Sequence, residues 1–146
     1  MLQRIQSILL LLAATAVFAL FKLPFGSTSE GIANSILFND RFFNIQDHIG
    51  LLAVFCGAGA LAFIAIFLFK NRSLQMTLSR IAIIANIIGM VLAVILFMQD
   101  SQTLGDALPK EEFGLGLPVL SIIFTAFALR FIKKDENLVK SMDRLR

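Results

Sequence analysis

The segment Ile49–Phe69, with the sequence IGLLAVFCGAGALAFIAIFLF, decides the fold. It carries no charge, and its one side chain with any polar character is the thiol of Cys56. As an α-helix it would extend about 31 Å, roughly the hydrocarbon thickness of a bilayer. A helix that faces water shows a polar face, and this segment has none. It therefore predicts a membrane-spanning helix.

The composition of the whole chain agrees with this prediction. Of the 146 residues, 58% are hydrophobic and 16% are charged, whereas a soluble domain is ordinarily about half apolar and about a quarter charged. The mean hydropathy is +0.83. The length fits a single domain. The single cysteine leaves no partner for an intrachain disulfide or a thiolate metal cluster.

Three further segments without charged residues predict three more membrane helices. They are Ile5–Phe21, Ile81–Met98 and Phe113–Leu129. Pro118 lies in the first turns of the last segment, where it is tolerated because first-turn N–H groups have no partner within a helix. The sequence thus predicts an all-α integral membrane four-helix bundle in one domain, 1–146, with helices at about 5–22, 49–69, 81–98 and 113–132 and a tail at 133–146.

The first apolar segment has a second interpretation as a secretory signal peptide. It follows the basic residue Arg4, and Ala14-Thr15-Ala16 resembles a cleavage site. However, the apolar run continues beyond this site as far as Phe21. We therefore expect a retained membrane helix, and an intact mass that begins at Val17 would reverse this interpretation.

The segments between the helices are more polar. Pro24–Asp47 is rich in turn-forming residues and predicts a loop, in which Ser35–Phe38 and Phe42–Phe43 either lie on the bilayer surface or form a small strand. Lys70–Arg80 predicts a short basic connector, and Gln99–Glu112 predicts an acidic loop. All three segments are expected outside the hydrocarbon layer.

The basic residues are divided unequally between the two sides of the predicted bundle. The N-terminal segment, the second loop and the tail together carry ten of the thirteen basic residues and three of the ten acidic residues. Basic residues in short loops favour the cytoplasmic side of a membrane. The distribution therefore predicts that both termini face the cytoplasm.

Asn86 is the one strongly polar side chain near the centre of a predicted helix. Small residues accompany it on one stripe of that helix, which indicates a surface that packs against a neighbouring helix. A lone buried amide usually bonds to another helix, and Ser121 and Thr125 are its candidate partners. We interpret these three residues as an intramembrane polar contact, and a functional site is the alternative.

The tail combines apolar residues at helical spacing with basic residues. Leu138, Val139, Met142 and Leu145 are interspersed with Lys134, Lys140, Arg144 and Arg146. This pattern predicts a short amphipathic cytoplasmic helix that lies on the membrane surface and is attracted by anionic lipid head groups. The alternative is a solvated charged tail that only sets the orientation.

Both ends of the chain resemble a known family. MLQRIQ at residues 1–6 and KDENLVKSMDRLR at residues 134–146 are similar to a bacterial family of small four-helix inner-membrane proteins, a domain of unknown function. The resemblance covers the whole chain and implies four helices in a bacterial inner membrane. It implies no activity, substrate or catalytic residue.

The predicted topology brings both of these ends to the cytoplasmic face. We expect Arg4 to pair there with one of the acidic residues of the tail, which are Asp135, Glu136 and Asp143. Together with Arg144, these residues form the candidate docking rim. A membrane-protein partner would bind to this polar cluster.

The sequence lacks the residue sets that many membrane enzymes and pumps require. No Asp or Glu lies within the four apolar segments, although a proton-coupled pump needs such a group. One histidine cannot supply bis-histidine haem ligation. Clustered zinc ligands and a base beside a nucleophile are missing as well. We therefore expect no catalytic residue, no cofactor, no metal and no nucleic-acid partner.

These considerations leave one leading function and two others. The leading interpretation is a non-enzymatic structural or accessory subunit that presents the docking rim to a partner or to lipid. The alternative is a small transporter or channel subunit, which would need a water-accessible cavity beside Asn86. A lipid-modifying enzyme would have only Asp40, Asp47 and His48 as candidate groups at the outer interface.

Overall fold

The computed structural model describes residues 2–32, 34–104 and 109–143 of the chain. Within these residues the chain is mostly helical and forms four α-helices, as the sequence predicts. They are α1 (Leu2–Ala19), α2 (Ile49–Phe67), α3 (Arg72–Asp100) and α4 (Leu117–Asp143). Three segments are helical, long enough and apolar enough to cross a membrane: Ile49–Phe67, Arg72–Asp100 and Phe113–Val139. The apolar part of α1, Ile5–Ala19, is shorter.

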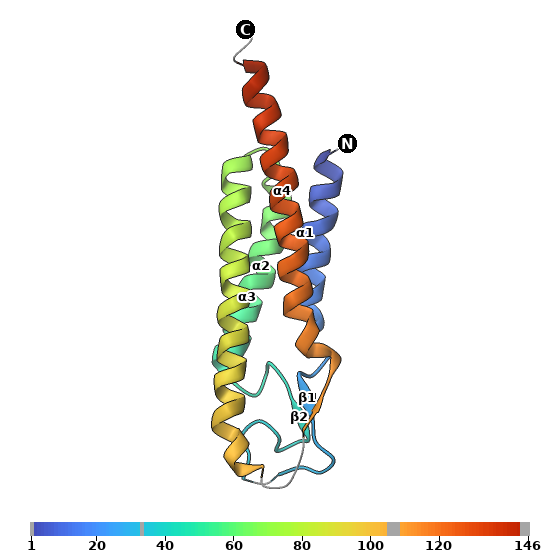
Figure 1. The fold of residues 1–146 in the computed structure, drawn as a ribbon, viewed down its shortest axis with the longest axis vertical. Helices are drawn as coiled ribbons and strands as arrows, with labels where there is room; N and C mark the ends of the chain where they lie inside the picture. Colours follow the sequence, from blue (N-terminus) through green and yellow to red (C-terminus); the bar gives the residue numbers. More distant parts are fainter. Residues whose placement is uncertain (1, 33, 105–108, 144–146) are drawn as a thin grey trace.

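The four helices lie side by side (Figure 1). Helix α1 packs against α2 and α4, and α3 packs against the same two helices. The start of α1 and the last turns of α4 lie at one end, which we call the terminal end. The opposite end holds three short strands, and we call it the sheet end. At the terminal end, α4 extends past the other three helices (Figure 1).

Small side chains bring the helices close together. Ala14 of α1, Ala62 of α2 and Ala82 of α3 are buried in one cluster. Gly89 of α3 faces the ring of Phe55, and a Cβ atom at this glycine would lie 2.7 Å from that ring. Helices in lipid associate through close packing of this kind, because lipid tails are as apolar as leucine.

Helix α3 begins earlier than its apolar segment predicts. The side chain of Asn71 caps the helix by accepting a hydrogen bond from the backbone N–H of Leu74 at 3.2 Å. Such a cap satisfies one of the N–H groups that a helix start leaves unpaired. Most of the predicted basic connector, residues 70–80, is therefore the first part of α3. At the sheet end, α3 runs on to Asp100.

Within the described residues, the tail does not form a helix of its own. Residues 133–143 continue α4 without a break. The stretch Arg130–Asn137 contains no Gly or Pro, and half of its eight residues are good helix formers, so nothing in it ends the helix. Residues 144–146 of the predicted amphipathic helix lie outside the described part of the chain.

A small antiparallel sheet closes the sheet end. Its strands are β1 (Gly26–Ser27), β2 (Phe42–Phe43) and β3 (Lys110–Glu111), in the order β2-β1-β3. Two 3₁₀ helices, η1 (Ser101–Thr103) and η2 (Phe113–Gly116), lead out of α3 and into α4. Of the two alternatives for Phe42–Phe43, the structure forms the strand.

The long loop before α2 supplies much of the core at the sheet end. Leu37, Phe38, Phe43 and Ile45 of this segment are buried, and they cluster with Phe55 of α2. Burial of large aromatic and aliphatic side chains is the main favourable contribution to folding. The loop therefore covers the ends of the helices with its own apolar side chains.

Candidate functional site

Buried polar side chains occupy the interior of the helices from the terminal end to about their middle. Five of them are at most 1% exposed: Gln75, Ser79 and Asn86 of α3, and Ser121 and Thr125 of α4. Gln6 of α1 is buried as well. Polar groups away from water are costly unless they are hydrogen-bonded. The hydrogen-bond partners of these side chains therefore indicate whether each residue only packs against its neighbours or is also available to bind a ligand.

The structure brings Asn86 and Ser121 together. Nδ2 of Asn86 donates to the backbone oxygen of Ala82 at 3.0 Å and to Oγ of Ser121 at 3.4 Å. Oγ1 of Thr125 donates to the backbone oxygen of Ser121 at 2.8 Å, so this hydroxyl bonds within its own helix. Oδ1 of Asn86 is buried and has no hydrogen-bond partner among the described residues. The contact joins α3 to α4 through a single long bond.

Two further polar residues are buried: Gln75, which the sequence places in the predicted connector, and Gln6, which belongs to the N-terminal motif MLQRIQ. Both amide atoms of Gln75 and Nε2 of Gln6 lack a hydrogen-bond partner within the described chain. Leu78 of α3 packs against the cluster that contains Leu10 of α1. Gln75 and Gln6 each lie about one turn closer to the terminal end than these leucines, so they occupy the same level. Buried groups of this kind are sites where water or an ion ordinarily binds.

The spacing of the buried residues along α3 identifies Gln75. Gln75 and Ser79 extend the buried stripe of Ala82, Asn86 and Gly89 toward the terminal end at intervals of three and four residues. The interpretation of residues 70–80 as a connector concealed this continuation. Recognition of Asn71 as a helix cap would have revealed it.

The candidate docking rim is described only in part. Asp135 forms an ion pair with Arg72, with Oδ2 and Nη2 3.0 Å apart, and both side chains are largely shielded from solvent. Glu136 lines an open pocket together with the turn between α2 and α3. The side chains of Arg4 and Asp143, and all of Arg144, lie outside the described part of the chain. The pairing expected for Arg4 therefore stays a prediction.

The basic residues of α4 lie just beyond its apolar part. Lys133 and Lys134 are exposed. The guanidinium group of Arg130 lies 5.8 Å from the centre of the Phe127 ring, a distance at which a cation is attracted by the ring face. Leu138 and Val139 follow on the same helix and are exposed. This part of α4 thus presents cations and apolar groups together.

Asp100 is a buried carboxylate at the sheet end that the sequence analysis placed in an acidic loop. It accepts hydrogen bonds from the hydroxyl of Ser35 and from the backbone N–H groups of Ile36 and Leu37, the latter two at 3.2 Å. The hydroxyl of Ser35 in turn accepts a bond from the N–H of Phe38 at 2.8 Å. Asp100 therefore holds the loop segment 35–38 against the end of α3.

The three candidate groups for a lipid-modifying enzyme have structural partners. Nδ1 of His48 caps α2 by accepting from the N–H of Gly50 at 3.1 Å. Oδ2 of Asp47 accepts from the N–H of Asn44 at 2.5 Å, and Oδ1 of Asp40 accepts from the N–H of Phe42 at 3.3 Å. Burial raises the pKa of Asp47 to about 6, and nearby Asp40 adds to this effect. These contacts shape the loop and the start of α2.

Comparison with known proteins gives one match. A family model described as a domain of unknown function, DUF4293, matches residues 2–145. No curated protein and no solved structure matches the chain.

Proposed function

The chain belongs to the DUF4293 family, and from its own residues we propose that it is a non-enzymatic accessory subunit of a bacterial inner membrane. In this proposal the four helices form an integral membrane bundle, and both termini face the cytoplasm. The projecting end of α4 binds a membrane-protein partner. The three apolar helical segments support the membrane location.

The charges at the two ends support the proposed orientation. The terminal end carries Arg72, Lys133 and Lys134, whereas the sheet end carries Asp47, Glu112 and most of the other acidic residues of the chain. Basic residues near the ends of membrane helices favour the cytoplasmic side. The terminal end would therefore face the cytoplasm, where cations also contact anionic lipid head groups.

The projection of α4 is the observation that carries the docking proposal. The helix Leu117–Asp143 is about 40 Å long, which exceeds the roughly 30 Å of a hydrocarbon layer. Its last turns extend beyond α1, α2 and α3 (Figure 1). There, Leu138 is 48% exposed and Val139 is 39% exposed, in a region that we place in the cytoplasm. Apolar groups displayed beside cations are typical of a protein contact surface.

The ion pair between Arg72 and Asp135 fixes the direction of this projection. It joins the start of α3 to α4 at the level where α4 leaves the other helices. A surface held in one direction loses less conformational freedom on binding than a flexible tail would. We infer a partner with an acidic surface around an apolar contact.

The test is site-specific photocrosslinking in native membranes. A photoreactive amino acid at residue 138 should form a protein adduct that the same probe at Ile88, which is equally exposed on the middle of α3, does not form. The double change Lys133→Glu and Lys134→Glu should remove the adduct while the chain stays in the membrane. Identical adduct patterns at residues 138 and 88 would contradict the proposal.

The buried unpartnered amides favour one second candidate, a small transporter or channel subunit. Gln75 and Asn86 offer the interior polar atoms that have no hydrogen-bond partner among the described residues. However, Asn86 is absent from the lining of the apolar pocket at the sheet end and of the open pocket beside Glu136. In a Cys56→Ala background, a path would make Ser121→Cys reactive toward a membrane-impermeant maleimide. The accessory function predicts no reaction from either side.

A further inference from the structure

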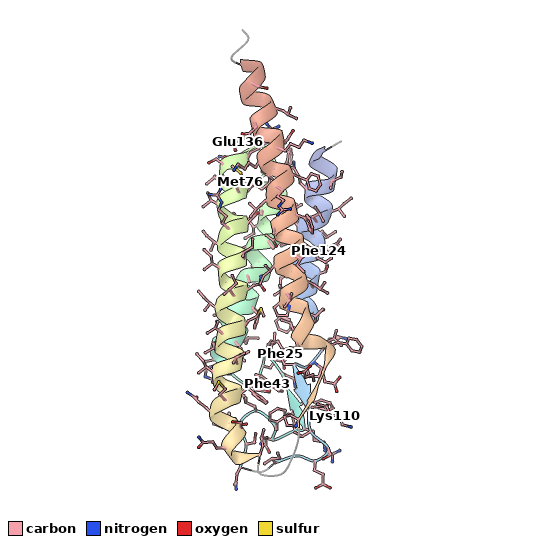
Figure 2. All side chains as sticks on the ribbon, in the orientation of Figure 1. Phe25, Phe43, Met76, Lys110, Phe124 and Glu136 are labelled. Carbon is pink, nitrogen blue, oxygen red and sulfur yellow. The ribbon has the colours of Figure 1, made fainter. Side chains whose placement is uncertain are left out.

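An apolar pocket of about 250 Å³ lies at the sheet end. Phe25, Phe38 and Phe43 line it, together with Phe97 of α3 and Leu115 of η2. Figure 2 shows Phe25, Phe43 and Lys110 gathered at this end of the structure. The space is larger than an apolar cavity of about 150 Å³ that takes up benzene. It can therefore accept a segment of a hydrocarbon chain.

The divergence of two helices creates this pocket. Helix α3 continues to the sheet end, while the start of α4 bends away from it toward the sheet (Figure 1). Val94 of α3 and Leu115 of η2 line the pocket, yet Val94 is 53% exposed and Leu115 is 44% exposed. The pocket therefore opens sideways, on the lateral surface of the helices. In the proposed membrane location, this surface faces lipid.

One charge of β3, the carboxylate of Glu111, lies at the pocket where the apolar surface ends, because the neighbouring Lys110 pairs with Ser27 on the other face of the sheet. Lys110 and Glu111 of β3 belong to its lining. The strand register places Glu111 beside Gly26 and Phe43 on one face of the sheet, because paired residues share a face. Phe43 is buried on that face, so Glu111 lies on the pocket side. Oγ of Ser27 donates to Glu112 at 2.7 Å, which anchors the residue next to Glu111.

The position of the pocket along the helices matches the part of a lipid chain that lies next to the head group. Its α3 residues run from Met90 to Phe97 and thus lie within about 15 Å of the end of that helix at Asp100. An acyl chain that enters from the side at this level leaves its head group at the sheet. There, a carboxylate can pair with an ammonium group.

We propose that this pocket binds one acyl chain of a zwitterionic aminophospholipid, phosphatidylethanolamine. The chain lies against Phe25, Phe38 and Phe97, and the ammonium group of the lipid pairs with Glu111. The proposal rests on the proposed membrane location but is independent of the docking role of α4. A bound lipid would also fill the space left between α3 and α4.

The test is native mass spectrometry of the purified full chain in detergent, titrated with phosphatidylethanolamine or with phosphatidylglycerol. The wild-type chain should retain one phosphatidylethanolamine. Ala93→Phe places a ring in the pocket and should lower the affinity at least tenfold. Val94→Trp blocks the mouth without filling the interior and should act in the same direction. Ile84→Phe, at an exposed position elsewhere on α3, is the matched control and should bind as the wild type does.

The head group is tested separately. Glu111→Gln should reduce the preference for phosphatidylethanolamine over phosphatidylglycerol at least threefold, since it removes the partner of the ammonium group. A phosphatidylethanolamine that carries a diazirine in its acyl chain should label peptides with Met90, Val94 or Phe97. If both Ala93→Phe and Val94→Trp bound the lipid with wild-type affinity, the lipid would not bind in this pocket. Equal retention of the two lipids by the wild type would contradict the proposed preference for phosphatidylethanolamine. A crosslink at residue 94 to a second copy of the chain would show that protein, and not lipid, covers the pocket.

A failure of this proposal can be distinguished from a failure of the proposed function. A chain that is found in the membrane fraction but retains no lipid in the pocket contradicts only the lipid proposal. A chain that is found in the soluble fraction contradicts the membrane location on which both proposals rest.

Discussion

At Gly114 the backbone before α4 comes close to the backbone after α1. Its N–H donates to the backbone oxygen of Pro24 at 3.0 Å. A Cβ atom at residue 114 would lie 2.2 Å from the same oxygen and 2.6 Å from that of Leu23. Because both obstacles are backbone atoms, no side-chain rotation can relieve the clash. A glycine is therefore required here for steric reasons.

We predict that Gly114→Ala destabilises the protein, by about 1–3 kcal/mol as is typical of overpacked sites. The matched control is Gly116→Ala in the same 3₁₀ helix, since a Cβ at residue 116 meets no atom within 4 Å. The control should leave the stability unchanged or raise it slightly, because alanine restricts the unfolded chain. Thermal unfolding of the two variants in detergent would measure the difference. Equal midpoints would show that the sheet end tolerates the added methyl group.

Asp47 makes the stability of the protein depend on pH, in a direction that follows from its raised pKa. Burial raises its pKa to about 6, compared with about 3.9 in an unfolded chain. The folded state therefore binds the proton more tightly between these two values. The resulting stability is fully present below about pH 4 and is lost as the pH rises through 6.

We predict that Asp47→Asn raises the unfolding temperature at pH 7.5 and has little effect at pH 4. The amide oxygen can still accept the hydrogen bond from Asn44, so the variant removes the charge and keeps the contact. Because other carboxylates also titrate in this range, the comparison is the difference between variant and wild type at each pH. A difference that does not change with pH would mean that Asp47 carries no raised pKa.

At the scale of elements, Asp100 connects the end of α3 to the loop segment 35–38. One carboxylate satisfies the hydroxyl of Ser35 and the N–H groups of Ile36 and Leu37. Phe38 follows directly and is a fully buried member of the core at the sheet end. Loss of this carboxylate would leave several buried donors without partners.

We predict that Asp100→Ala lowers the free energy of unfolding by about 1–3 kcal/mol or more, the usual cost of leaving buried polar groups unpaired. Hydrogen exchange should accelerate at the amides of Leu37 and Phe38. Asp40→Ala is the control, because Asp40 lies in an exposed part of the loop, where it accepts from the N–H of Phe42. If both variants exchanged alike, Asp100 would not hold the loop.

The elements also show how far the sequence predicts the fold. The four helices were predictable because long uncharged segments have few other stable forms in lipid. The start of α3 was missed because Asn71 was not recognised as its cap. The end of α4 was missed because polar residues such as those of 133–143 suit a helix and a connector equally well. The three short strands depend on contacts between residues 26, 43 and 111, which are distant in the sequence. No local pattern encodes such pairings.

The candidate site was predictable to a similar degree. Asn86 could be identified because an amide stands out in an apolar segment, and the structure places it beside Ser121. Gln75 was missed because the start of α3 was placed too late. Asp100 was missed because its partners come from a loop of irregular conformation, which sequence spacing does not describe. The pocket at the sheet end likewise depends on tertiary contacts alone.

At the scale of the whole molecule, the two ends have different characters. The terminal end displays cations, a projecting helix and buried polar residues behind it. The sheet end carries acidic residues, a packed aromatic core and an apolar pocket that opens sideways. This asymmetry agrees with the proposed orientation, in which the terminal end faces the cytoplasm and presents the proposed contact surface, and the proposed lipid site lies near the other end.

The central claim is that the chain spans the membrane with its terminal end in the cytoplasm. Single cysteines introduced in a Cys56→Ala background, Ser141→Cys at the terminal end and Ser29→Cys at the sheet end, test it directly, since both serines are exposed. In spheroplasts treated with a membrane-impermeant maleimide, we predict labelling of Ser29→Cys at once and of Ser141→Cys only after lysis. Labelling of Ser141→Cys in intact spheroplasts would contradict the account.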